Sequence, residues 1–413
     1  MTEPLPGATE PTAGDTAAVR RAYLHVGAPK TGTTYLQGVL WRNRRVLQQA
    51  GAHVLGRGRG DHYQAGKDLM DMPFDPADPG VDWTGAWDIL AAAAAASPAE
   101  VVLISDEHLA SLSPDQVRRA AAGLAPREVH VVYATRNLKG LMPSEWQEYV
   151  KHGSTLDFDT WSNKILTTPR RGPGRWFWSV HDPVDVIRRW STAVPAANIH
   201  VITMPPPSAG PNELWHRFAG VVGIDPQLAT DFDVAGNTSL GLAEAEVLRR
   251  VNLALPEDFP RWYRTGLTRD VLAAKVLGAR PSSDRPQLSE ALDQALVKRA
   301  ERSIKGLKAS GCDVVGDLAD LRVVPDAGPP TAAPSTQVLL DTSVDAIAGL
   351  LVHMAWMRDE RRRSESRLRQ AMHKAPMMRR IRGRVASWED RNRAVAMTLS
   401  RYRRVRAGLR HDG

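Results

Sequence analysis

The stretch "HVGAPKTGTTYLQGVL" (residues 25–40) joins a strand-like run to a helix-like run through a loop rich in glycine and threonine. Gly27, Gly32 and Thr34 fit the phosphate-binding pattern G-x-x-x-x-G-K-[ST], but Thr33 occupies the lysine position. The lysine of this loop, Lys30, lies three residues earlier. Strand, loop and helix in this order predict an anion site made of backbone N–H groups and a helix N-terminus.

The position of Lys30 indicates which anion the loop suits. In an ATPase loop the lysine reaches the β- and γ-phosphates. Lys30 would instead lie beside the first phosphate, which suits a shorter donor whose labile bond is next to a 5′-phosphate. The alternative is a turn that caps a helix and leaves Lys30 in solvent. We favour the anion site, because a turn alone does not require a lysine, a glycine and two threonines in this place.

The bulk composition is that of an ordinary globular protein, with 413 residues, of which 43% are apolar and 24% charged. The single cysteine, Cys312, excludes a disulfide framework or a multi-cysteine metal site within the chain and favours a reducing cytoplasm. Residues 1–19 are polar and rich in proline, glycine and threonine, which predicts a disordered leader without signal-peptide features. No uninterrupted apolar run reaches the ~18 residues of a spanning helix.

Four apolar, β-branched runs predict strands that are covered on both faces, since each run is continuous rather than alternating. They lie at residues 22–28, 101–105, 129–135 and 199–204. Helix-like stretches separate them, for example residues 34–50 and 114–125. The order predicts the α/β fold class: a P-loop-like parallel sheet with helices on both faces, followed by a C-terminal α-helical extension.

The chain divides by composition into a leader (1–19), one domain (20–323), a proline-rich linker (324–337) and a basic helical extension (338–413). Residues 341–413 hold 18 Lys and Arg against 8 Asp and Glu, whereas the remainder holds 36 against 38. The positive net charge of +8 therefore belongs to the extension, and the main body gives no sign of nucleic-acid binding.

Two motifs together resemble one family. "PKTGTT" after a strand resembles the 5′-phosphosulfate loop of sulfotransferases that use 3′-phosphoadenosine 5′-phosphosulfate (PAPS). "VVYATRNLKGLMPSEW" (residues 131–146) places Arg136 at a strand end and Ser144 eight residues later, and is similar to the 3′-phosphate site of that family. The resemblance spans residues 21–290, and "SEWQEYVKHG" also looks like bacterial members. For the further basic cofactor contact of the family, "GARPSSDR" (residues 278–285) is the candidate.

The resemblance implies a transferase that moves a sulfuryl group from PAPS to a hydroxyl or amine, with no metal required. Lys30 would stabilise the leaving bridging oxygen as a catalytic residue. The implied donor-binding residues are Lys30, Thr31, Gly32, Thr33, Thr34, Arg136 and Ser144. Sulfuryl transfer, like phosphoryl transfer, depends mainly on positioning and on neutralising charge.

A general base should lie at the end of a neighbouring strand, where "VVLISDEHLASL" (residues 101–112) supplies Asp106, Glu107 and His108. The family uses histidine in some branches and glutamate in others, so Glu107 and His108 are both catalytic candidates, with Glu107 slightly favoured. His62 is a third candidate. Each of these residues could instead serve as a helix cap or a satisfied hydrogen-bonding group.

Two other functions fit parts of the pattern. A P-loop kinase or NTPase would use Asp106 as its metal-binding carboxylate, but the displaced lysine argues against it. A non-catalytic module that binds a nucleotide or a sulfated ligand would keep the fold without turnover.

The acceptor is expected to be a carbohydrate, glycolipid or small molecule. Five tryptophans could line its pocket, although core packing is favoured for each: Trp146, Trp161, Trp176, Trp178 and Trp190. In the extension, the spacing of apolar residues predicts an amphipathic helix. Docking on the domain or on a second copy is favoured, and contact with anionic lipid at the inner membrane face is the alternative to a purely cytoplasmic location.

Overall fold

The computed structural model describes residues 19–72, 82–234, 239–260, 263–281, 284–325 and 331–389. The predicted leader, apart from residue 19, and the last 24 residues of the extension lie outside the described residues. The chain forms two compact units, residues 1–343 and 344–413.

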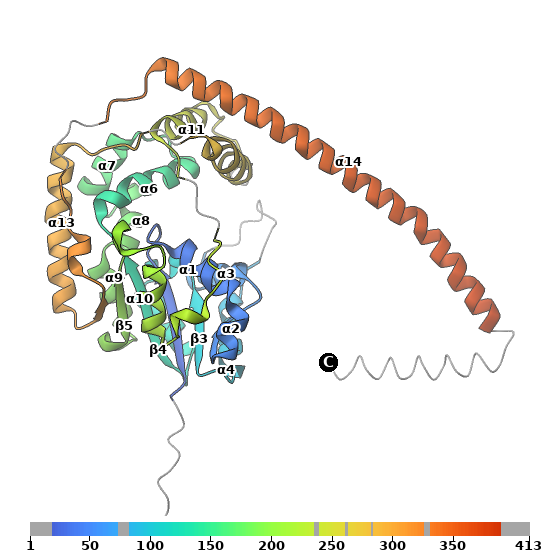
Figure 1. The fold of residues 1–413 in the computed structure, drawn as a ribbon, viewed down its shortest axis with the longest axis horizontal. Coiled ribbons are helices and arrows are strands. Elements are labelled where there is room, and N and C mark those ends of the chain that lie inside the picture. The colour runs from blue at the N-terminus through green and yellow to red at the C-terminus, as the bar shows by residue number, and fades with distance from the viewer. Residues whose placement is uncertain are drawn as a thin grey trace, which may run out of the picture. The chain divides into compact units, whose positions relative to one another are not determined.

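The first unit is built on a six-stranded sheet of order β2-β3-β1-β4-β5-β6 in which every neighbouring pair is parallel (Figure 1). Leu24 of β1 lies opposite Ile104 in β3 and Val131 in β4. The strands are β1 (Arg21–Gly27), β2 (Ala52–Val54), β3 (Val101–Ser105), β4 (Glu128–Thr135), β5 (Ile199–Thr203) and β6 (Asp313–Val315).

Helices cover both faces of the sheet. The described α-helices are α1 (Thr33–Arg42), α2 (Arg44–Gln49), α3 (Arg59–Leu69), α4 (Ala86–Ala96), α5 (Pro114–Gly123), α6 (Leu138–Lys151), α7 (Phe158–Thr167), α8 (Gly172–His181), α9 (Pro183–Trp190), α10 (Glu213–Val222), α11 (Leu242–Ala254), α13 (Glu290–Ala309) and α14 (Thr336–Glu389). A 3₁₀ turn, Glu107–Ser111, follows β3, and a π-helix, Arg264–Val276, follows α11.

Two apolar clusters form the core, one on each face of the sheet. Leu24 and Val26 of β1 pack with side chains of α4, α5, α9 and α13 on one face. Tyr23, which points the other way, packs with side chains of α1, α2 and α10. Alternate residues of one strand thus enter opposite clusters, as a strand buried on both faces requires.

The predicted fold class is confirmed, and the four predicted strands agree with the structure to within one residue at each end. The sequence did not indicate β2 and β6, because each has only three residues and no extended apolar run. The predicted helix over residues 34–50 is two helices that break at Asn43. The Asn43 amide donates to the Val39 and Asp231 carbonyls and accepts from the Thr230 and Asp231 N–H groups, so it binds a distant loop at the break.

Four of the five tryptophans considered for an acceptor pocket belong to the core. Trp146, Trp161, Trp178 and Trp190 are buried, and the indole N–H of Trp146 donates to the Leu156 carbonyl. Trp176 differs, because it is only partly buried.

The long helix α14 carries apolar side chains on its surface. Leu340, Val344, Ile347, Leu351 and Met354 are each more than half exposed and recur at intervals of three and four residues. Residues 336–367 are, by length and composition only, long and apolar enough to cross a membrane.

Arg127 is buried and lies in the chain between α5 and β4. Its hydrogen bonds at the amino edge of the sheet can be tested by mutation. Its guanidinium donates to the carbonyls of Ala94 (2.9 Å), Ser97 (2.6 Å) and Ala99 (3.0 Å). We expect Arg127→Met to lower the free energy of unfolding by about 3 kcal/mol or more, because buried carbonyls would lose their donors. Chemical denaturation measures this loss.

The matched control is Arg118→Met, which removes an exposed pair with Asp115 and should cost less than about 1 kcal/mol. Equal losses in the two variants would contradict a structural role for the Arg127 contacts.

Candidate active site

The candidate site lies at the carboxyl edge of the sheet, where β1, β3 and β4 end side by side. From β1 the chain passes to β2 at one edge of the sheet, whereas from β3 it crosses to β4 on the other side of β1. Open α/β sheets bind ligands at such a switch point. The loops after these three strands contain the residues singled out by the sequence motifs.

The loop after β1 forms the predicted turn into a helix. Gly32 has a positive φ of 83°, and a Cβ at this position would lie 2.3 Å from Leu214. The Thr31 hydroxyl donates to the Ala28 carbonyl at 2.6 Å. Helix α1 begins at Thr33, and its N-cap residue, Gly32, has no side chain with which to cap the first turn. The N–H groups of this turn are therefore suited to an anion.

Lys30 links this loop to the segment after β4. Its Nζ lies 2.6 Å from Oε2 of Glu148 in α6. Its carbonyl accepts a hydrogen bond of 3.3 Å from Nη1 of Arg136, the first residue after β4. The two motifs, which are 106 positions apart at this contact, are thereby brought together.

A second arginine, Arg285, lies near Arg136 and Ser144. Burial and the charge of Arg285 hold the pKa of Arg136 below its usual value. No carboxylate of the described residues pairs with Arg136. Two neighbouring guanidinium groups whose charges are so little neutralised by carboxylates favour the binding of an anion between them.

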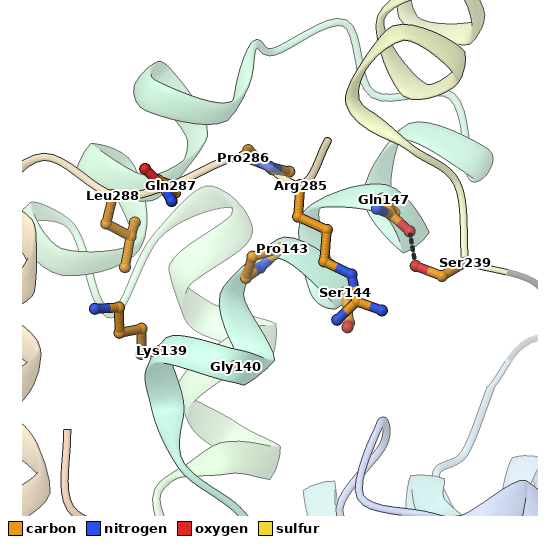
Figure 2. Close-up of a pocket in the computed structure, with 10 residues that line it drawn as sticks. All are labelled: Lys139, Gly140, Pro143, Ser144, Gln147, Ser239, Arg285, Pro286, Gln287 and Leu288. Carbon is orange, nitrogen blue, oxygen red and sulfur yellow. Dashed lines mark hydrogen bonds between the residues drawn. The ribbon is translucent and has the colours of Figure 1, made fainter. Parts of the chain in front are cut away.

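A cavity of about 160 Å³ is lined by Ser144 and Arg285, and Figure 2 shows the Arg285 side chain reaching toward Ser144 of α6. Lys139 and Gln147 of the same helix also line it. The Gln147 side chain is fixed by Ser239, whose hydroxyl donates to Gln147 Oε1 at 3.2 Å. Arg285, the last residue of the segment 278–285, is the member of that segment that lines the cavity.

The segment after β3 packs directly against the loop after β1. A Cβ on Gly27, whose φ is 97°, would lie 2.8 Å from Cβ of Glu107. Burial and the charge of Asp106 raise the pKa of Glu107, while His108, a hydrogen bond with Thr33, and Lys30 act in the opposite direction. Glu107 therefore lies within the electrostatic reach of Lys30 and contacts the first residue of α1.

His108 and Asp106 form a hydrogen-bonded pair. Nδ1 of His108 is 2.8 Å from Oδ1 of Asp106, and the same oxygen accepts the backbone N–H of His108 at 2.8 Å. Asp106 is buried, whereas the His108 side chain is 26% exposed. A carboxylate at Nδ1 fixes the ring tautomer and leaves Nε2, which has no hydrogen-bond partner among the described residues, to accept a proton.

His62 differs from His108, because both of its ring nitrogens contact the backbone. Nε2 is 2.7 Å from the Leu55 carbonyl, and Nδ1 accepts the Ser105 N–H at 3.2 Å. His62 is buried and joins α3 to β3, so it is suited to a structural role rather than to proton transfer.

The sequence did not single out Glu148 and Lys151, the α6 residues beside Lys30. Helical periodicity places residues 144, 148 and 151 on one side of α6, and this is the signal that could have found them. The partner of Lys30 could not be found in this way, because it depends on how α6 meets a loop 118 positions away.

No protein-family model and no curated protein sequence matches this chain. Among solved structures, it is similar to a sulfotransferase from Alicyclobacillus acidocaldarius, with 16% identity and a TM-score of 0.37. The similarity covers 61% of this chain and 96% of that one.

The raised pKa of Glu107 predicts a pH dependence of stability. As pH rises above the ordinary carboxyl range, the folded protein holds this proton more tightly than the unfolded chain does, so the free energy of unfolding falls. Glu107→Gln has no carboxyl at this position and so does not lose stability in this way. The free energy of unfolding of Glu107→Gln minus that of the wild type should therefore be larger at pH 8 than at pH 4.

Chemical denaturation at the two pH values measures the difference. Glu257→Gln, which makes the same substitution at an exposed site, is the control. If this difference in the free energy of unfolding decreases from pH 4 to pH 8, the ionised form of the Glu107 carboxyl is not disfavoured in the folded protein.

Proposed function

We propose that this protein is a sulfotransferase that moves a sulfuryl group from PAPS to a hydroxyl or amine of an acceptor. One observation carries the proposal: the phosphosulfate-type loop and the segment of Arg136 and Ser144 meet at one edge of the sheet, joined by the bond from Arg136 to the Lys30 carbonyl. A donor with phosphates at both its 5′ and 3′ ends would need anion sites at two such loops.

The two ends of the donor have different chemical requirements. At the 5′ end, the N–H groups of the first turn of α1 and the ammonium of Lys30 suit a phosphosulfate. At the 3′ end, Arg136, Arg285 and the Ser144 hydroxyl suit a phosphate, because a guanidinium matches its oxygens with two parallel donors. No metal is needed when cationic side chains neutralise both groups.

In the proposed reaction, the acceptor oxygen forms a bond to sulfur as the bond from sulfur to the bridging oxygen breaks. The bridging oxygen leaves with the 5′-phosphate, and Lys30 stabilises the charge that develops on it. His108 takes the acceptor proton at Nε2, and Asp106 holds the ring and stabilises the resulting imidazolium. The sequence slightly favours Glu107 as the base. In the proposed reaction Glu107 instead supports the loop through its hydrogen bond with Thr33.

The proposed acceptor is a carbohydrate or glycolipid hydroxyl. Two aromatic rings flank His108: Tyr63 at a centroid distance of 5.4 Å and Trp176 at 6.0 Å. Tyr63 is exposed and Trp176 is partly buried, so both present ring surface beside the proposed base. Aromatic faces pack well on the apolar side of a sugar ring.

The donor site is tested by calorimetry with adenosine 3′,5′-bisphosphate against ATP with Mg²⁺. We expect metal-free binding of the bisphosphate, weakened by about 2 kcal/mol or more in Arg136→Ala and by about 1 kcal/mol or more in Arg285→Ala, since a phosphate would lose a charge-assisted contact. Lys30→Ala should lower turnover more than affinity.

Arg250→Ala, at an exposed arginine that pairs with Glu246, is the control. A preference for ATP with Mg²⁺ would favour the kinase or NTPase hypothesis over the sulfotransferase. Normal bisphosphate affinity in Arg136→Ala would show that the donor site lies elsewhere.

The reaction itself is tested by mass spectrometry of cell extracts incubated with the protein and PAPS. An acceptor should gain about 80 daltons, the mass of an added SO₃ group, and His108→Ala should lower kcat by roughly 100-fold or more. Glu107→Gln should have the smaller effect. Bisphosphate binding without turnover on any acceptor would favour a non-catalytic binding module.

A further inference from the structure

Glu148 of α6 is the meeting point of two lysines and a histidine. Its carboxylate lies 2.6 Å from Lys30 Nζ, 3.6 Å from Lys151 Nζ and 3.4 Å from His152 Nε2. Lys151 is the last residue of the same helix and His152 is its C-cap, whereas Lys30 comes from the loop after β1. The contact with Lys30 is therefore tertiary, and it joins the candidate site to α6.

This cluster is sheltered from solvent. The side chains of Lys30, Lys151 and Glu148 are 20%, 13% and 30% exposed. Burial alone would raise the pKa of Glu148, but His152, Lys30 and Lys151 together outweigh it and hold the pKa below its usual value. Glu148 is accordingly ionised at neutral pH.

Among the described residues, Glu148 is the one carboxylate that forms an ion pair with either lysine. Burial lowers the pKa of Lys151 and Glu148 raises it, whereas the charges of Lys30 and Arg269 lower it again, so the two ammonium groups repel each other although they share Glu148. The contacts are therefore those of a site with spare positive charge. An anion that entered the loop would relieve this repulsion and would compete with Glu148 for Lys30.

We propose that Glu148 acts as an internal counter-ion, which holds the Lys30 ammonium in the free protein and yields it to the anionic donor. Glu148 is thus a positioning residue that acts through Lys30, and the proposal rests on the function proposed above. In the free protein, Glu148 keeps Lys30 beside the loop. Donor binding exchanges one anion for another at the same ammonium, so Glu148 makes binding weaker than the cations alone would allow.

The test is the affinity for adenosine 3′,5′-bisphosphate in a double-mutant cycle. Glu148→Gln should tighten binding by roughly tenfold, because it removes the competing charge. In the Lys30→Ala background the same change should tighten binding by no more than about threefold, since only direct repulsion remains to be relieved. With PAPS, Glu148→Gln should lower KM without raising kcat.

Glu246→Gln, a carboxylate on α11 that pairs with Arg249 and Arg250, is the control and should leave the affinity unchanged. Equal tightening in the two backgrounds, or none in either, would overturn the counter-ion role. If Glu148→Gln does not fold, Glu148→Asp, which keeps the charge but shortens its reach, should also tighten binding, and unchanged or weaker binding would count against the role. If the wild-type protein does not bind the bisphosphate, the proposed function fails first.

Discussion

The site depends on one constraint, which is that neighbouring parallel strands end at the same edge of a sheet. β1 has β3 on one side and β4 on the other, so the residues that follow these three strands must meet although they are far apart in the chain. The loop of Lys30, the turn of Glu107 and His108, and the segment of Arg136 meet in this way. The cores on the two faces of the sheet hold the strands in register, and loops can then supply the chemistry.

The same edge of the sheet also holds cationic side chains that repel one another. Burial and the charge of Arg285 lower the pKa of Arg136, and Lys30 and Lys151 share the carboxylate of Glu148. Such arrangements cost stability in the free protein and are tolerated where an anion relieves them. By contrast, Lys139 near the same cavity pairs with Asp293 of α13 at 3.0 Å, so not every cation around the site is left in excess.

The sequence was informative where the signal is local. Continuous β-branched runs located β1, β3, β4 and β5, and a strand followed by glycine and threonine located the loop. The short strands β2 and β6 carry no such pattern. Contacts that depend on packing were also not predictable: the partner of Lys30, the approach of Arg285 to Ser144, and the two backbone contacts that make His62 structural. These contacts are set by the angles at which helices cross the sheet, and single-residue patterns do not contain that information.

The close packing of Gly27 on Glu107 has a consequence for how this site can change. Any side chain at position 27 would displace Cα and Cβ of Glu107, so position 27 must stay glycine unless the turn after β3 moves. A donor loop without this glycine, transplanted from another protein, would have to bring its own partner from the end of β3. In engineering and in evolution, a loop after β1 that lacks the glycine therefore has to change together with the end of β3 rather than by itself.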